Sequence, residues 1–443
     1  MGVFMKVMKF GGTSVGKPER MHHIVSLVTS QKESTIVVLS ALSGTTNALV
    51  EIIYNIAKGD RITAKQNIDK LEQHYHNFIK ELVKEPKANQ KANAIVAEHF
   101  EFLNIILKIS FSEALSKDIL AQGELLSTKL FSTYLEERGI DHVLLPALEF
   151  MTIDYNDEPQ IGSIKVKLTQ LLAQYPDKKL FVTQGYICRN ARGEVDNLKR
   201  GGSDYSASLI ASAMNASVCE IWTDIDGMHN NDPRIVNRTK PVEQLSFEEA
   251  AELAYFGAKI LHPASIWPAQ QYKIPVKLLN TMEPGAKGTL IVEEAGSVGV
   301  KAVAAKDNII AIRIKSSRML LAYGFLRKVF EVFEKYRTSI DMVTTSEVAI
   351  SLTIDNSTHL KDIQKELDPF GVIEIDENQV IISVVGNEIS QTVNIVKKLF
   401  ESIQNIPVRM VSYGGSPHNI SLLVPATYKT QILQQLNKGM FDL

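Results

Sequence analysis

Residues 4–18 read FMKVMKFGGTSVGKP, a mostly apolar run that leads directly into two glycines and two hydroxyl side chains. Such a run predicts a strand at Phe4–Phe10 that is buried on both faces of a sheet. Glycines after a strand let the backbone approach phosphate, and Lys9 can neutralise negative charge that develops there. The stretch therefore predicts an α/β fold with a phosphate-handling turn after its first strand.

The same stretch also has the spacing of a P-loop, from Gly11 to Gly16 and Lys17. A P-loop continues with a serine or threonine whose hydroxyl holds Mg²⁺. Pro18 occupies that position here and has no hydroxyl. The P-loop interpretation is therefore disfavoured.

Further strand candidates alternate with helical patterns along the first two thirds of the chain. They are Thr35–Ser40, His142–Leu145, Leu180–Gln184, Val218–Thr223 and Pro275–Leu279. This alternation indicates a mainly parallel sheet with helices on both faces. Between Gly59 and Phe111 only the helical period is present. That segment is either a simple packing insert or a lid or interface.

Composition limits the class of protein. With 443 residues, 45% of them hydrophobic, two or three globular domains are expected. The formal charge of −2 offers no basic surface for nucleic acid. Cys188 and Cys219 lie far apart, without the spacing of a disulfide framework or a zinc site, and no other metal site is indicated. No run suits a signal peptide or a membrane span, so a cytoplasmic protein is expected.

The segment Glu283–Gly299 is rich in glycine and predicts a domain connection. After it, two successive βαββαβ patterns appear, and the second lacks its last strand. We expect Val298–Ala304 to supply that strand, which nests the first unit inside the second. The predicted domains are 1–292, 305–377, and 298–304 together with 378–443.

Four other segments could bind ligands, and each has a plainer interpretation. They are Ser40–Asn47, Lys199–Tyr205, Thr223–Arg234 and Tyr255–Pro263. The first could be a turn with a helix cap, and the second an N-cap rather than an anion site. The third follows a buried strand, where open α/β sheets place ligands. The fourth offers a single lysine, a residue that is usually on the surface.

Taken together and in order, six segments closely resemble the aspartate kinase family of the amino-acid kinase superfamily. They are KFGGTSVG, VLSALSGTTN, GELLST, GYICRNARGEVDNLKRGGSDYSA, WTDIDGMHNNDPR and FGAKILHP. The similarity covers the whole chain, and its C-terminal repeats look like ACT domains. The resemblance implies a three-layer sandwich around a mainly parallel sheet. It also implies transfer of the ATP γ-phosphoryl group to the side chain of L-aspartate, the first step towards lysine, threonine and methionine.

The resemblance assigns roles to individual residues. It places Lys9 over the transferred phosphoryl group, with Asp204 positioning it. The implied aspartate-binding residues are Thr46, Glu124, Arg200 and Ser203. The implied nucleotide-binding residues are Gly11, Gly12, Thr223, Asp224, His229, Arg234 and Lys259. His229 stands where the family often has tyrosine, which leaves packing against the nucleotide open.

These roles make chemical sense. Arg200 can bind the α-carboxylate of aspartate bidentately, while Glu124 pairs with the α-ammonium group. The other carboxylate is already ionised at neutral pH, so no general base is required and alignment with charge neutralisation should dominate. Mg²⁺ is implied by ATP, with few direct protein ligands.

In the C-terminal region, a set of residues resembles the effector pocket of lysine-sensitive members. The set comprises Met319, Gly324, Phe325, Leu326, Asp341, Ser346 and Glu347. The intervening Leu321–Tyr323 is less polar than such a pocket usually is. Lysine is the leading effector, and threonine or no effector is the alternative. A homodimer or homotetramer through the ACT domains is expected.

Three alternatives stay open at this stage. Another amino-acid kinase, acting on glutamate or N-acetylglutamate, is disfavoured by GGSDYSA and by the C-terminal repeats. A catalytically inactive amino-acid sensor is disfavoured because Lys9, Glu124, Arg200 and Asp204 are all present. Fusion to homoserine dehydrogenase is disfavoured because no second glycine-rich dinucleotide fingerprint follows.

Overall fold

The computed structural model describes residues 5–198, 201–257, 261–296, 298–316 and 323–443. They fall into two compact units, each described by itself. The first contains Met1–Met228 with Leu261–Glu293, and the second contains His229–Ile260 with Glu294–Leu443. The segment His229–Ile260 therefore packs with the C-terminal region, whereas the predicted domain 1–292 included it. The predicted domain limits stay predictions.

The first unit contributes seven neighbouring strands to a mainly parallel sheet, in the order β3-β4-β2-β1-β7-β9-β10. All neighbouring pairs with a described register are parallel except β9 with β10, which is antiparallel. The strands are β1 Met5–Phe10, β2 Ser34–Leu39, β3 Val143–Leu145, β4 Leu180–Gln184, β7 Val218–Thr223, β9 Val276–Asn280 and β10 Thr289–Val292. A short hairpin, β5 Ile187–Arg189 with β6 Val195–Asn197, follows β4. The six predicted strands are confirmed within one residue at each described end.

Both faces of this sheet are covered. In β1, Val7 and Met8 point to opposite faces and neither is exposed. Helix α9 packs on β1, β2 and β7, and α6 packs on β2, β3 and β4. The helices of the sandwich are α1 Gly12–Val15, α2 Pro18–Thr29, α7 Ala147–Phe150, α8 Ile161–Leu172, α9 Gly202–Met214 and α11 Pro263–Gln271. The predicted α/β sandwich with a mainly parallel sheet is confirmed.

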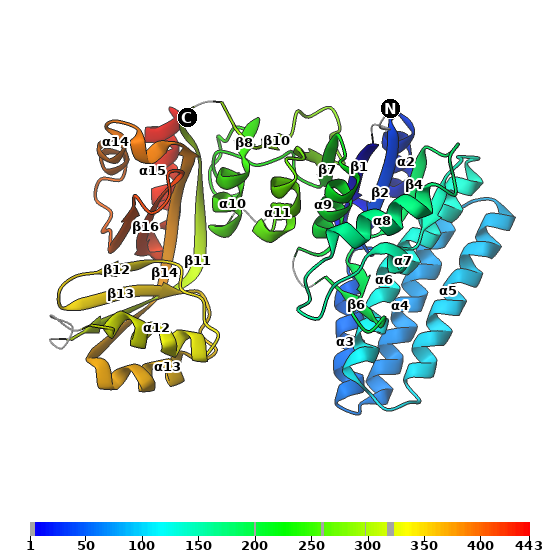
Figure 1. Cartoon of the computed structure of the whole chain (residues 1–443), viewed down its shortest axis with the longest axis horizontal. Helices are drawn as coiled ribbons and strands as arrows, with labels where there is room; N and C mark the ends of the chain where they lie inside the picture. The colour runs from blue at the N-terminus through cyan, green and yellow to red at the C-terminus, as the bar shows by residue number, and fades with distance from the viewer. Residues whose placement is uncertain (1–4, 199–200, 258–260, 297, 317–322) are drawn as a thin grey trace. The chain divides into compact units, whose positions relative to one another are not determined.

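The predicted helical segment Gly59–Phe111 forms α4 and α5, which belong to a helical bundle beside the sheet together with the helices on either side of them (Figure 1). Its helices are α3 Thr45–Ala57, α4 Arg61–Leu82, α5 Pro86–Ile106 and α6 Glu113–Glu137. The periodic apolar residues of α4 are all buried in the core: Ile68, Leu71, Tyr75, Phe78, Ile79 and Leu82. Buried packing of this kind supports the interpretation of a packing insert.

The second unit contains an antiparallel sheet with the order β12-β13-β11-β14-β16-β15. Its strands are β11 Gly299–Lys315, β12 Val343–Thr345, β13 Ala349–Ile354, β14 Val372–Asn387, β15 Met410–Tyr413 and β16 Asn419–Pro425. Its helices are α12 Phe325–Lys335, α13 Leu360–Leu367, α14 Ile395–Ser402 and α15 Lys429–Phe441. β8 Gln244–Ser246 and α10 Phe247–Tyr255 belong to the same unit.

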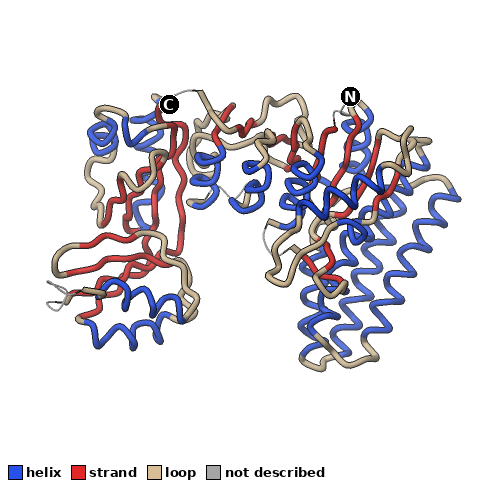
Figure 2. Tube along the Cα trace, in the orientation of Figure 1, coloured by secondary structure: helices blue, strands red, loops and turns tan. Residues whose placement is uncertain are grey.

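Two long strands, β11 and β14, run side by side through this sheet (Figure 2). The first half of β11, from Gly299 to Lys306, pairs with Ile381–Asn387 of β14. Val303 lies in a hydrophobic cluster with α14 and α15, whereas Ile312 lies in a separate cluster with α12 and α13. The first half of β11 therefore packs with α14 and α15 of the second repeat, and the predicted nesting of the two repeats stays a prediction.

Both cysteines are buried and unpaired. Burial raises the pKa of the Cys188 thiol to about 12, so this thiol stays protonated. Among the helices that the structure describes, none has the length and apolar character needed to span a bilayer.

Candidate active site

Lys9 and Asp204 form an ion pair at the carboxyl end of β1. Nζ of Lys9 lies 2.6 Å from Oδ1 of Asp204, and Lys9 is only 8% exposed. Asp204 belongs to the first turn of α9, so a strand and a helix fix the pair jointly. A Cβ atom at Gly11 would lie 3.2 Å from Nζ of Lys9, so glycine leaves room for the ammonium group.

The glycine turn after β1 is held by two neighbouring strands. The backbone N–H of Gly11 and the hydroxyl of Ser14 both donate to the carbonyl oxygen of Trp222, each at 3.3 Å. The Ser14 hydroxyl also lies 2.7 Å from that of Thr281, just after β9. The sequence analysis did not predict Thr281; the signal that could have found it is a polar pair, Asn280 and Thr281, directly after the predicted strand Pro275–Leu279.

The loop after β2 joins two of the predicted aspartate-binding residues. The hydroxyl of Ser40 donates to Oγ of Ser203 at 2.9 Å. The backbone N–H of Ala41 donates to Oε1 of Glu124 at 3.2 Å. Ser127 in α6 donates to the carbonyl oxygen of Ser40 at 2.6 Å, which fixes the loop. Ser203 and Glu124 therefore contact the same short loop, at Ser40 and Ala41, the first two residues of the candidate segment Ser40–Asn47.

Close backbone approach at this loop depends on two glycines. A Cβ atom at Gly185, after β4, would lie 2.4 Å from Cβ of Ser203. A Cβ atom at Gly123, in α6, would lie 2.8 Å from Cβ of Ala41. Either side chain would push the surrounding elements apart, so glycine at both positions keeps Ser203 and Glu124 close to the loop.

Glu124 is a buried carboxyl group with one unused oxygen. It is 4% exposed, and Oε2 has no hydrogen-bond partner within the described residues. Burial raises the pKa of Glu124 to about 7, and the hydrogen bond from Ala41 opposes that shift. A buried carboxylate is stabilised by a cation. The geometry therefore suits a ligand that brings a positive charge to Oε2.

Of the other two predicted aspartate-binding residues, Thr46 and Arg200, the structure describes only Thr46. Thr46 is exposed at the start of α3, whereas Thr45 is buried, with its hydroxyl 3.0 Å from that of Tyr75. Arg200 lies outside the described residues. Its predicted contact with the substrate α-carboxylate stays a prediction.

The predicted nucleotide-binding residues divide between the units. In the first unit, the hydroxyl of Thr223 donates to Oδ1 of Asp224 at 3.1 Å. In the second unit, Nδ1 of His229 lies 2.9 Å from Oγ1 of Thr239. Arg234 is exposed and bonds to a neighbouring aspartate. Lys259 falls outside the described residues.

The predicted effector residues that the structure describes belong to the second unit. Phe325 starts α12 and packs edge-on against Phe370 in the core, with ring centroids 5.9 Å apart. Leu326 and Glu347 are exposed. The backbone N–H of Ser346 donates to the carbonyl oxygen of Ala349 at 2.8 Å. Met319 lies outside the described residues, and Gly324 caps α12 with φ 78°.

Asp341 is the predicted effector residue with a buried, charged side chain. Its side chain is fully buried, and Oδ1 accepts from the hydroxyl of Tyr255 at 2.6 Å and from Nζ of Lys306 at 2.7 Å. Oδ2 has no hydrogen-bond partner in the described part of the chain. Lys306 also pairs with Asp355 at 2.9 Å. Asp341 is thus a fixed carboxylate with one oxygen available. The sequence reasoning missed Tyr255 and Lys306.

Comparison with known proteins agrees with this architecture. Residues 5–280 match the amino acid kinase family, and residues 382–440 match an ACT domain. The α/β sheet with its buried lysine and aspartate at a glycine turn is therefore the fold of an amino acid kinase.

Two relatives show which family of amino acid kinases this chain belongs to. The lysine-sensitive aspartokinase 3 of Escherichia coli is 34% identical over 451 residues, covering 98% of this chain and 99% of the relative. The chloroplastic aspartokinase 3 of Arabidopsis thaliana is 35% identical over 464 residues, covering 98% of this chain and 81% of the relative. The chain belongs to the aspartokinases.

Solved structures of an aspartokinase are similar to this chain over nearly its whole length. E. coli aspartokinase III in complex with aspartate and ADP, in the R-state, superposes with a TM-score of 0.83 at 31% identity, covering 99% of this chain and 100% of that one. The same enzyme with lysine and aspartate, in the T-state, gives a TM-score of 0.82 at 32% identity, covering 99% of each chain.

Proposed function

We propose that this chain transfers the γ-phosphoryl group of MgATP to the side-chain carboxylate of L-aspartate, giving 4-phospho-L-aspartate, and that lysine inhibits it. The observation that carries the proposal is the buried Lys9–Asp204 pair beside the loop that holds Ser203 and Glu124. The aspartate, ADP and lysine bound by the E. coli relative support it.

In this mechanism the chain acts by alignment and charge neutralisation. The acceptor carboxylate is already ionised, so it can attack phosphorus without a general base. Lys9 neutralises negative charge on the transferred group, and Asp204 keeps its ammonium group in place, so little reorganisation is needed during reaction. The nucleotide phosphates would hold Mg²⁺ with few direct protein ligands, and the ion would supply further charge neutralisation there.

Glu124 selects the amino acid. An α-ammonium group can pair with its unused Oε2 atom. An N-acetylated substrate has no such cation and would leave the buried carboxylate unpaired, which costs binding free energy. Aspartate is therefore favoured over N-acetylglutamate, and Arg200 is proposed to bind the α-carboxylate.

The proposal is tested by supplying MgATP with L-aspartate, L-glutamate or N-acetyl-L-glutamate and trapping acyl phosphate with hydroxylamine. Hydroxamate from aspartate alone is the expected result. Turnover of another substrate would assign a different amino-acid kinase. No turnover, together with retained lysine binding, would identify a sensor.

The activity should depend on pH through Glu124. Its raised pKa of about 7 means that the carboxylate needed for the substrate ammonium is lost as the pH falls through that value. Between about pH 8 and about pH 6, kcat/KM for aspartate should fall about tenfold, because it reports ionisation of the free enzyme. Glu124→Gln should have a low kcat/KM without this pH dependence. An unchanged slope in that variant would contradict the assignment.

Lysine inhibition should depend on Asp341. Asp341→Asn removes the fixed charge that faces the effector ammonium, and the lysine concentration for half-inhibition should rise about tenfold or more. Asp355→Asn is the matched control, because Asp355 also pairs with Lys306 but is partly exposed. Equal shifts in both variants, or unchanged inhibition in Asp341→Asn, would refute this effector site.

We also propose a cytoplasmic homodimer or homotetramer that assembles through the ACT repeats. The terminal strands of the described sheet, β12 and β15, carry exposed apolar side chains, among them Val343 and Tyr413. Sedimentation at the mass of one 49.3 kDa chain, with and without lysine, would contradict assembly.

A further inference from the structure

Helix α10 contacts the carboxylate of Asp341 through Tyr255, the last residue of the helix. The Tyr255 hydroxyl donates to Oδ1 of Asp341 at 2.6 Å, and Nζ of Lys306 donates to the same oxygen at 2.7 Å. The Lys306 ammonium group also lies 4.3 Å from the centre of the Tyr255 ring. Side chains from α10, from β11 and from the segment before β12 therefore meet at one carboxyl oxygen, and all three belong to the second unit.

The protonation states of the two donors suit this contact. Burial raises the pKa of Tyr255, and its hydrogen bond to Asp341 raises that pKa further, so the hydroxyl keeps its proton. Burial lowers the pKa of Lys306, but hydrogen bonds to Asp341 and Asp355 outweigh burial and raise it, so Lys306 stays charged. A neutral donor and a cation therefore share Oδ1 of Asp341.

The remaining oxygen of Asp341 is the one that a ligand can use. Oδ2 is buried and has no hydrogen-bond partner within the described residues, and a buried carboxylate oxygen is stabilised by a cation. The backbone N–H of Asp341 donates to the carbonyl oxygen of Thr353 in β13 at 2.9 Å. With its backbone held by β13 and Oδ1 held by two donors, the carboxylate has little freedom to rotate. Oδ2 is therefore a preorganised acceptor for an ammonium group.

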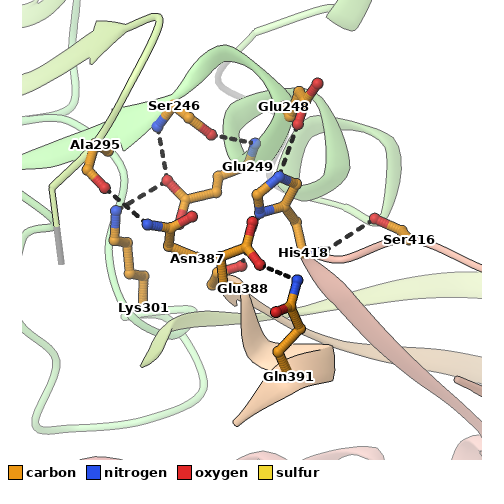
Figure 3. Close-up of polar contacts among 11 residues, drawn as sticks. Ser246, Glu248, Glu249, Ala295, Lys301, Asn387, Glu388, Gln391, Ser416 and His418 are labelled. Atoms are coloured by element: carbon orange, nitrogen blue, oxygen red, sulfur yellow. Dashed lines mark hydrogen bonds and ion pairs between the residues drawn. The ribbon is translucent and has the colours of Figure 1, made fainter. Parts of the chain in front are cut away.

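Helix α10 is itself attached to the second repeat (Figure 3). Glu248 lies 2.7 Å from Nε2 of His418, the residue before β16. One turn further along α10, Oε2 of Glu252 accepts from Nδ2 of Asn419 in β16 at 2.7 Å. Two successive turns of α10 therefore contact one end of β16, and its last residue contacts Asp341 of the first repeat.

The chain just beyond α10 lies directly against β11. A Cβ atom at Gly257 would lie 2.1 Å from the carbonyl oxygen of Ala305, the neighbour of Lys306 in β11. Gly257 also has φ 119°, a conformation that residues with side chains rarely adopt. Close approach of the two backbones therefore brings Tyr255 and Lys306 together.

We propose that Tyr255 is a positioning residue for the effector: its hydroxyl holds the Asp341 carboxylate so that Oδ2 receives an ammonium group of lysine. This inference rests on the proposed function, because it takes lysine as the ligand of Asp341. Since α10 is attached to the second repeat and Asp341 belongs to the first, lysine binding at Asp341 is linked to the stability of α10.

The test compares Tyr255→Phe with wild type in the full-length chain. Tyr255 is 41% exposed and the variant keeps its ring over Lys306, so the fold should be retained. The dissociation constant for L-lysine, measured by calorimetry, should rise about fivefold to tenfold, because a hydrogen bond to a charged group is lost. Tyr336→Phe is the matched control, because the Tyr336 hydroxyl also donates to a carboxylate of the same repeat, Glu366, at 2.7 Å. The control should bind lysine within about twofold of wild type.

Hydrogen exchange separates positioning from a merely structural role. At saturating lysine, amide exchange in Phe247–Tyr255 should slow in wild type, since occupied Asp341 holds Tyr255 more firmly. In Tyr255→Phe, saturating lysine should leave exchange in α10 unchanged. In an Asp341→Asn background, Tyr255→Phe should cause no further loss of lysine affinity, because both residues act at one contact.

Equal lysine affinity of Tyr255→Phe and wild type would overturn the inference, and so would additive losses in the double variant. Should Tyr255→Phe fail to fold, wild type alone decides, because unchanged exchange in α10 on lysine binding would also overturn it. Wild type that binds no lysine would refute both this inference and the effector assignment. Absence of aspartate turnover would refute only the proposed reaction, since calorimetry requires no turnover.

Discussion

Replacing Lys9 by alanine is expected to lower kcat by about a thousandfold or more, because a preorganised cation at the transferred group is removed. KM for aspartate should change little, since Glu124 and Ser203 are untouched. Hydroxamate formation at saturating MgATP and aspartate measures the effect. A circular dichroism spectrum like that of wild type would show that the unpaired Asp204 has not unfolded the chain.

Lys17→Ala is the matched control for this experiment. Lys17 is exposed and is the residue that a P-loop would require. Its kcat should stay within about twofold of wild type, because no phosphate contact is assigned to it. A large loss in Lys17→Ala with a small loss in Lys9→Ala would restore the P-loop interpretation and remove Lys9 from the mechanism.

Lys301→Met is expected to lower the free energy of unfolding of the second unit by about 3–5 kcal/mol, because it leaves a buried carboxylate without its cation. Lys301 is 9% exposed, and its partner Glu249 is fully buried (Figure 3). Glu249 also accepts from the backbone N–H of Ser246 at 2.6 Å, where it completes the N-terminal cap of α10. Loss of the pair should therefore loosen α10 as well as β11.

Urea unfolding followed by circular dichroism measures this change. Both tryptophans, Trp222 and Trp267, lie in the first unit, so their fluorescence should shift much less than the ellipticity. Lys335→Met is the control, because the Lys335–Glu366 pair is exposed and should contribute nothing measurable. Equal stability of Lys301→Met and wild type would show that Glu249 is stabilised by something other than Lys301.

The local sequence was sufficient to predict individual strands and helices. The apolar run before Gly11 forms β1, and the periodic residues of Arg61–Leu82 form the buried face of α4. Period and apolar character determine such elements because neighbouring residues share one environment. The pairing of Lys9 with Asp204 came from the family resemblance, and the structure places the two atoms in contact.

The contacts that the sequence did not predict join residues far apart in the chain. Thr281 reaches Ser14 only because β7 and β9 are neighbours, and Tyr255 reaches Asp341 only because α10 packs with the second unit. Such pairs have no local signal, since neither residue has an unusual pattern around it. The limits of compact units have the same difficulty, because they depend on which distant segments pack together.

The α/β class, the strand positions, the paired C-terminal repeats and, through the order of six motifs, the aspartokinase family can all be predicted from the amino-acid sequence. Those features depend on periodicity and on residue types at fixed spacing. Only the folded chain shows that one buried oxygen of Glu124 has no partner among the described residues, that Asp341 is held by Lys306, and that Asn437 accepts a hydrogen bond from Asn230. Burial and hydrogen-bond partners depend on which distant segments pack together, and packing is a property of the folded chain.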